Sequence, residues 1–125
     1  MRPAILALKG VLVTALPDEL TDHDIAEFQG EMLRAVERRR ARGLVVDISA
    51  LEILDTYLAR SICETAEMAR LLGTEVVVCG MRPAVALTLV EMGQELVGIE
   101  TALDLDGGLA AIEELIARRT RALVD

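Results

Sequence analysis

Two short apolar runs, each followed by a helical pattern, constrain the fold more than any other feature of the sequence. The runs are GLVVDIS (residues 43–49) and EVVVCG (residues 75–80). Both have the length of strands, and they are apolar without alternation, as strands buried on both faces are. Strands joined through helices need crossover connections, which place them parallel in one sheet. The sequence therefore predicts an α/β fold.

The remaining segments extend this pattern. Residues 5–16 form two apolar runs split by Lys9-Gly10, which is typical of a hairpin. Apolar spacings of three and four predict four helices: from beyond Pro17 to Gly43, from residue 55 to Gly73, over 82–93 and over 106–121. A weak strand is predicted over 97–101. We therefore expect one domain, residues 1–125, with a mostly parallel mixed sheet, an N-terminal antiparallel hairpin at its edge and about four helices.

The composition excludes several classes of function. The chain has 13 basic and 21 acidic residues, a formal charge of −8, and such a surface repels a nucleic-acid backbone. No apolar run approaches the roughly 20 residues that a membrane-spanning helix needs, and the N-terminus lacks the pattern of a signal peptide. We expect a cytoplasmic protein that binds neither nucleic acid nor membrane. Only Phe28 and Tyr57 are aromatic, so the core must be aliphatic.

Residues that bind metals or perform catalysis are sparse. His23 is the single histidine, and Cys63 and Cys79 lie 16 residues apart without CxxC spacing, which indicates buried free thiols. The pair Gly107-Gly108 belongs to no phosphate-binding motif, so we interpret it as a turn. No nucleophile stands beside a base. We expect no enzyme activity, no cofactor and no metal.

Asp47 offers one enzyme-like alternative. It closes a strand, as the phosphoacceptor aspartate of response-regulator receiver domains does. A receiver also needs an acidic pair after its first strand and a lysine after a later one, whereas the single lysine here, Lys9, follows the first strand. We therefore favour Asp47 as a strand-end residue that hydrogen-bonds nearby backbone.

The segment ILDTYLAR, residues 53–60, carries the strongest candidate site. Asp55 and Thr56 stand where a helix begins, and either side chain suits a helix cap. The same position favours negative charge, so a phosphate on Thr56 would be accommodated without unfolding the helix. Both interpretations remain open on the residues alone. A mixed apolar and charged patch for a partner is expected around them, from Tyr57, Leu58, Arg60, Met81 and Arg82.

Three stretches give the whole chain a resemblance to a known family: GLVVDISALEILDTYLAR, LLGTEVVVCGMRPAVALTLVEMG and IETALDLDGGL. The chain resembles a STAS domain, the fold of bacterial anti-sigma-factor antagonists. Within that family it is most similar to the stressosome scaffold branch, the RsbS type. The last two stretches are the more specific to that branch.

The resemblance implies a non-enzymatic switch in bacterial stress signalling. In this family the hydroxyl residue after the Asp is phosphorylated by a GHKL-type serine/threonine kinase (RsbT-like), which the scaffold holds until phosphorylation releases it. By position that residue is Thr56, with Ser61 as the fallback. The scaffold co-assembles with RsbR-like sensor paralogues, self-associates, and implies a phosphatase.

One position departs from the scaffold branch. RsbS-type proteins usually carry Ser where this chain has Thr56, as the sensor paralogues do, whereas the absence of a sensor domain from the sequence favours the scaffold. The alternative within the family is a partner-switching antagonist that binds an anti-sigma kinase one to one. A small-molecule-binding STAS module has no motif in its favour.

Overall fold

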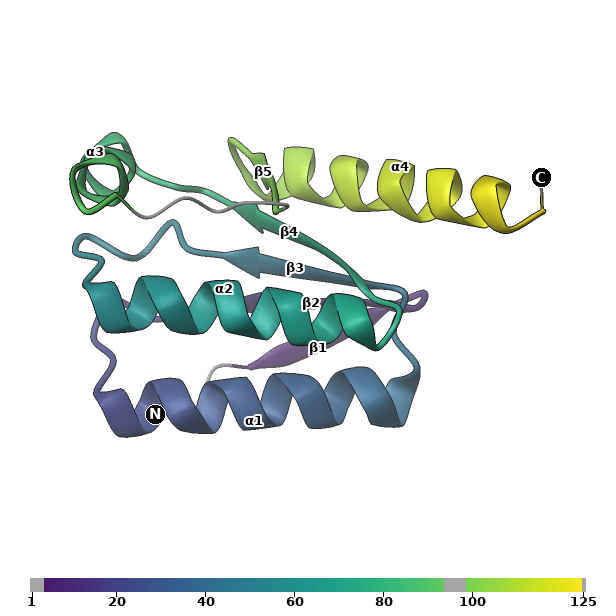
Figure 1. The fold of residues 1–125 in the computed structure, drawn as a ribbon, viewed down its shortest axis with the longest axis horizontal. Helices are drawn as coiled ribbons and strands as arrows, with labels where there is room; N and C mark the ends of the chain where they lie inside the picture. The colour runs from purple at the N-terminus through teal and green to yellow at the C-terminus, as the bar shows by residue number, and fades with distance from the viewer. Residues whose placement is uncertain (1–3, 94–98, 125) are drawn as a thin grey trace.

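The computed structural model describes residues 4–93 and 99–124, which form a five-stranded sheet and four helices (Figure 1). In chain order they are β1 (Ile5–Leu8), β2 (Val11–Ala15), α1 (Asp22–Arg39), β3 (Gly43–Asp47), α2 (Thr56–Leu71), β4 (Glu75–Cys79), α3 (Pro83–Glu91), β5 (Glu100–Ala102) and α4 (Leu105–Val124). This order confirms the predicted alternation. The strand expected over 97–101 is found as β5, and residues 97 and 98 lie outside the described residues.

The sheet has the strand order β1-β2-β3-β4-β5. β1 pairs antiparallel with β2, and the other neighbours pair parallel, so the predicted mixed sheet with a hairpin edge is confirmed. The hairpin turn contains Lys9 (φ 49°) and Gly10 (φ 82°), and two residues with positive φ are what a tight two-residue turn between twisted strands requires.

Helices cover both faces of the central strands. α1 and α2 lie together on one face, and α4 lies on the other against β3, β4 and β5 (Figure 1). Alternate residues of β3 point to opposite sides: Leu44 and Val46 pack under α1 and α2, whereas Val45 packs under α4. Burial on both faces explains why β3 reads as an unbroken apolar run.

The end of α1 differs from the expectation that Gly43 closes it. The helix ends at Arg39, and Arg40 takes the left-handed conformation (φ 48°) with its N–H donated to the Glu37 carbonyl. Gly43 is instead the first residue of β3. At the other end, Thr21 and Asp24 form the capping box that starts the helix, and hydrogen bonds from Thr21 lower the pKa of the Asp24 carboxyl.

Two glycines let α4 approach the sheet. A Cβ at Gly43 would lie 2.6 Å from Ile112 Cγ1, and one at Gly108 would lie 3.1 Å from Cys79 Cβ. The interpretation of Gly107-Gly108 as a turn before a helix is therefore wrong: both residues lie in α4, and the small size of Gly108 admits the neighbouring strand.

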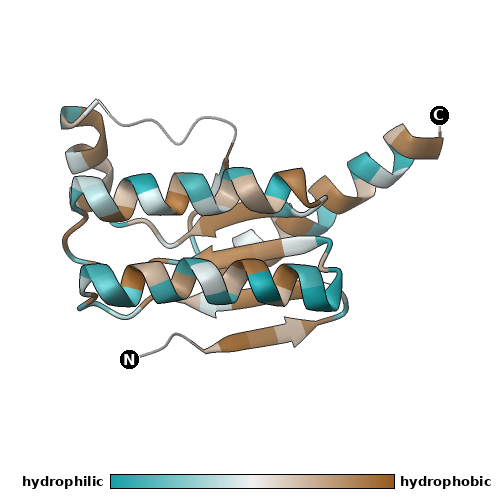
Figure 2. Cartoon of the chain, turned by 60° about the horizontal axis from the view of Figure 1, so that its bottom comes forward, coloured by the Kyte–Doolittle hydropathy of each residue, from teal (hydrophilic) through white to brown (hydrophobic). Residues whose placement is uncertain are grey.

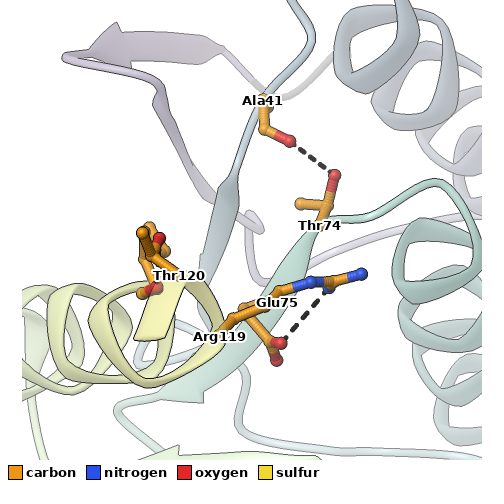
Figure 3. Close-up of polar contacts among 6 residues, drawn as sticks. Ala41, Thr74, Glu75, Arg119 and Thr120 are labelled. Atoms are coloured by element: carbon orange, nitrogen blue, oxygen red, sulfur yellow. Dashed lines mark hydrogen bonds and ion pairs between the residues drawn. The ribbon is translucent and has the colours of Figure 1, made fainter. Parts of the chain in front are cut away.

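Polar contacts fasten the edge of the sheet where the parallel strands begin (Figure 3). The buried Thr74 hydroxyl donates to the Ala41 carbonyl (2.7 Å), which joins the segments that lead into β3 and β4. Arg119 of α4 reaches Glu75 of β4, with 3.3 Å between Nη1 and Oε1. α4 is thus held to the sheet by an ion pair near its C-terminal end as well as by apolar packing.

Gly43→Ala should destabilise the fold because its methyl group would collide with Ile112 and push α4 away from β3. We expect the free energy of unfolding to fall by ~1–3 kcal/mol, as overpacking of a dense core does. Urea denaturation followed by circular dichroism measures it, since the chain has no Trp.

Gly30→Ala is the matched control. A Cβ at Gly30 of α1 meets only the mobile guanidinium of Arg34, at 3.2 Å. Helix propensity should then raise stability by up to ~1 kcal/mol. Equal destabilisation by both substitutions would contradict the packing role of Gly43.

Candidate functional site

The connection from β3 to α2 runs along the rim formed by the carboxyl ends of the strands. Asp47 at the end of β3 accepts a hydrogen bond from the Ser49 N–H through Oδ1 (2.9 Å), which confirms it as a strand-end residue bonded to nearby backbone. Leu51 and Leu54 are buried at 0% and 3% exposure and anchor the connection in the core, while Ile53 between them is 80% exposed. The start of α2 therefore has a fixed position.

Asp55 and Thr56 divide the two tasks expected at this helix start. Asp55 is the N-cap residue, and its Oδ1 accepts the Leu58 N–H at 2.7 Å. Thr56 is the first residue of α2; its side chain is exposed, and its hydroxyl donates to Met92 Sδ at 3.7 Å. Because the aspartate alone caps the helix, the threonine hydroxyl remains at the surface with only a weak sulfur acceptor.

The electrostatic surroundings of Thr56 favour an anion. The first turn of α2 carries no acidic side chain, unlike the first turns of α1 and α4. Unpaired N–H groups and the helix dipole give that turn a partial positive charge. Arg60 is exposed and stands four residues further along, on the same face of the helix. The adjacent Asp55 carboxylate opposes these effects, so a phosphate here would be directed outward.

Ser61, the fallback hydroxyl, occupies a different environment. It lies in the second turn of α2 and is 9% exposed. The Ser61 carbonyl accepts the hydroxyl of Thr65 at 2.7 Å, so the backbone at this point is held on the packed side of the helix. Only Thr56 of the two presents its hydroxyl to solvent.

Arg82 links the start of α3 to the β3–α2 connection. Its Nε donates to the Ser49 carbonyl at 2.8 Å, and its Nη1 lies 3.8 Å from Glu52 Oε1. The strand ends approach closely at this point, because a Cβ at Gly80 (φ 78°) would lie 2.7 Å from Asp47 Oδ1. The rim is therefore built from two crossover connections held against each other.

The predicted patch is only partly at the surface. Tyr57 is 45% exposed and Arg60 and Arg82 are exposed or nearly so, whereas Met81 is half-buried against the core. Leu58 is a correction: it is 5% exposed because it points inward from α2, so it serves the core and not the patch.

Sequence reasoning missed the residues that hold the site together. Met92, Glu52 and the Ser49 carbonyl contact predicted site residues. The contacts of Ser49 and Met92 span 33 and 36 residues along the chain. No local spacing reveals such partners; only the parallel order of β3 and β4 would have placed their connections side by side.

A hollow of about 410 Å³ lies beside the helix start. It is bounded by the connection from β2 to α1 and by the start of α2, and Asp18, Glu19 and Asp55 place carboxylates around it. Asp18 Oδ1 also accepts the Glu52 N–H at 3.2 Å, which fixes the two loops to each other. The rim near Thr56 is accordingly acidic, with Ile53 and Tyr57 as exposed apolar contacts.

The two cysteines are free thiols. Cys79 is fully buried under α4, where burial and then Asp47 and Asp104 raise the pKa of its thiol to about 11. Cys63 is only half-buried, contrary to the expectation of two buried thiols, and burial again raises its pKa. Among residues 4–93 and 99–124, no three His, Cys, Asp or Glu side chains gather as metal ligands. No helix in those ranges is long and apolar enough to span a membrane.

Comparison with known proteins decides the family. The family model described as "STAS domain" matches residues 2–105, most of the chain. The chain belongs to the STAS domain family. Among solved structures, this STAS domain is similar to a variant of Moorella thermoacetica RsbS in which serine is replaced by glutamate, at 41% identity and a TM-score of 0.83 over 94% of this chain and 99% of that one.

Two further similarities point to the same branch of the family. A structure titled as the molecular architecture of the stressosome matches at 40% identity and a TM-score of 0.77, over 90% of this chain and 97% of that one. The RsbT co-antagonist protein RsbRA of Bacillus subtilis is 26% identical over 97% of this chain and 44% of its own length. The STAS domain described here thus spans less than half of that curated relative.

Asp55→Ala should destabilise α2 because the first-turn N–H of Leu58 loses its acceptor. The expected loss in free energy of unfolding is ~1 kcal/mol, typical of an N-cap. Asp55→Asn keeps a capping oxygen and should retain most of that stability, as urea titrations of both variants would measure. If alanine and asparagine behaved alike, the cap would not be the stabilising contact.

Proposed function

We propose that this STAS domain is a non-enzymatic scaffold and kinase antagonist in bacterial stress signalling, switched by phosphorylation of Thr56. Its kinase would be a GHKL-type serine/threonine kinase of the RsbT kind, released when Thr56 is phosphorylated. The observation that carries the proposal is the exposed Thr56 hydroxyl at the first position of α2, beside the aspartate that caps the helix in its place.

The physical chemistry of the site supports a switch that leaves the fold unchanged. The Thr56 hydroxyl has no capping bond to lose, and its Met92 contact is weak. The helix N-terminus and Arg60 favour the added negative charge. The core beneath is independent of it, because Leu54 and Leu58 hold the helix start from below. Phosphorylation would therefore alter the surface and not the packing.

Release of a bound kinase follows from the charge at the rim. A partner that docks there meets Ile53, Tyr57 and the carboxylates beside the hollow. A phosphate adds a charge of about −1.5 to −2 and a solvated group at the centre of that contact. Its burial costs free energy unless the partner supplies matching cations, so the phosphorylated rim binds more weakly.

The similarity to RsbS and to the stressosome structure supports an assembly role. We propose that the chain assembles in the cytoplasm with RsbR-like sensor paralogues and with itself, and that a phosphatase resets Thr56. The alternative is a one-to-one antagonist of an anti-sigma kinase. Sedimentation of the chain mixed with such a paralogue separates the two, since a scaffold forms a particle far larger than a heterodimer.

Thr56→Ala should abolish phosphate incorporation from ATP by the RsbT-like kinase while leaving the thermal melt close to that of the wild type. Phosphopeptide mass spectrometry on the intact chain gives the site. Ser61→Ala is the matched control, because its hydroxyl is buried, and it should be phosphorylated at the wild-type rate. Undiminished incorporation in Thr56→Ala would refute the assignment.

Thr56→Glu should weaken capture of the kinase roughly tenfold, equivalent to ~1.4 kcal/mol of binding free energy. Thr56→Gln has nearly the same size without the charge and should bind close to the wild type. Titration calorimetry with the purified kinase measures all three affinities. Equal weakening by Glu and Gln would mean that shape and not charge controls release.

A further inference from the structure

β1 leaves one edge of the sheet uncovered. It is the outermost strand, beyond β2, and is largely apolar (Figure 2). Its leucines, Leu6 and Leu8, are 57% and 46% exposed. α4 packs on β3, β4 and β5, so the face of the sheet that β1 and β2 share with α4 has no helix over it (Figure 1).

The exposed leucines lie on the α4 side of the sheet. Ile5 packs against the core beneath α1 and α2, and successive strand residues point to opposite faces, which directs Leu6 and Leu8 toward the other side. There Leu8 and Val11 border a groove of about 710 Å³ whose opposite wall is α4, with Leu109 and Ile116. Sheet and helix thus present one continuous apolar surface.

The strand lacks the features that keep sheet edges from pairing. Proteins usually protect an edge with a charged residue, a proline or a bulge within the strand. β1 reads ILAL, with none of these, and its four residues pair with β2 in unbroken register. Its outer backbone groups have no strand partner among the described residues.

We infer that β1 pairs antiparallel with β1 of a second copy of this chain about a two-fold axis. Such an axis joins the same patch on both copies, so it places α4-side face beside α4-side face. Leu6 and Leu8 of both copies then contact one another and cover the grooves. A second copy fits because the strand is its own complement in hydrophobic pattern.

Charge favours the same occupant. The edge of the sheet at the hairpin turn is basic, with Lys9, Arg40 and Arg42 exposed. The opposite edge is acidic, with Asp18 and Glu19 following β2. Antiparallel pairing reverses one copy relative to the other, so the basic turn of each lies beside the acidic edge of the other. This inference deepens the proposed scaffold role by naming its interface and rests on it.

Leu6→Lys places a charge in the edge strand and should weaken dimerisation at least tenfold in analytical ultracentrifugation of the full chain without kinase. Leu71→Lys, at a position 87% exposed at the end of α2, is the control and should dimerise like the wild type. A wild-type chain that stays monomeric at hundreds of micromolar, or Leu6→Lys that dimerises normally, would overturn the interface.

Hydrogen exchange gives a second measurement that needs no variant. The amides of Ile5–Leu8 should gain protection as the wild-type concentration rises, while those of β5 at the other edge should not. Concentration-independent exchange in β1 overturns the pairing even if Leu6→Lys fails to fold. Neither experiment depends on Thr56: loss of phosphorylation with dimerisation intact would refute the switch alone, and the reverse would refute the interface alone.

Discussion

Everything in this molecule depends on the burial of β3 and β4 between two layers of helices. With only two aromatic residues in the chain, that burial is aliphatic, and short side chains such as Val45 and Val77 bring the layers close together. The close approach of α4 in turn requires Gly43 and Gly108, where any Cβ would press on a neighbouring side chain. Dense packing of this kind holds strand ends in fixed positions.

The fixed strand ends explain why the rim suits a switch. The β3–α2 connection is tied into the core by Leu51 and Leu54 and to the neighbouring connection by Arg82. A hydroxyl presented on such a support changes its charge without moving what lies beneath. The information in the proposed phosphorylation is therefore local, and a partner detects it only by touching the rim.

The sequence predicted the architecture well because the unbroken apolar runs of β3 and β4 and the helical spacings between them are local patterns. It predicted the end of α1 poorly, since Arg40 adopts a conformation usually left to glycine while Gly43 is required by a contact with Ile112, far along the chain. Gly107-Gly108 was misinterpreted for the same reason.

The candidate site divides in the same way. Asp55 and Thr56 could be found from the residues, because a cap and a helix start are local signals. Their separate tasks could not, and neither could the inward direction of Leu58 or the contacts of Thr56 with Met92 and of Arg82 with Ser49. Those follow from which connections the parallel sheet brings together.

The opposite charges at the two edges of the sheet have a consequence for encounters in solution. With Arg40 and Arg42 at one end and Asp18, Glu19 and Asp55 at the other, the domain carries a permanent dipole along its strands. A cationic partner exerts a torque on that dipole before contact and turns the acidic rim toward itself, within about 10 Å at physiological salt. The molecule thus arrives already oriented, with Thr56 facing the incoming surface.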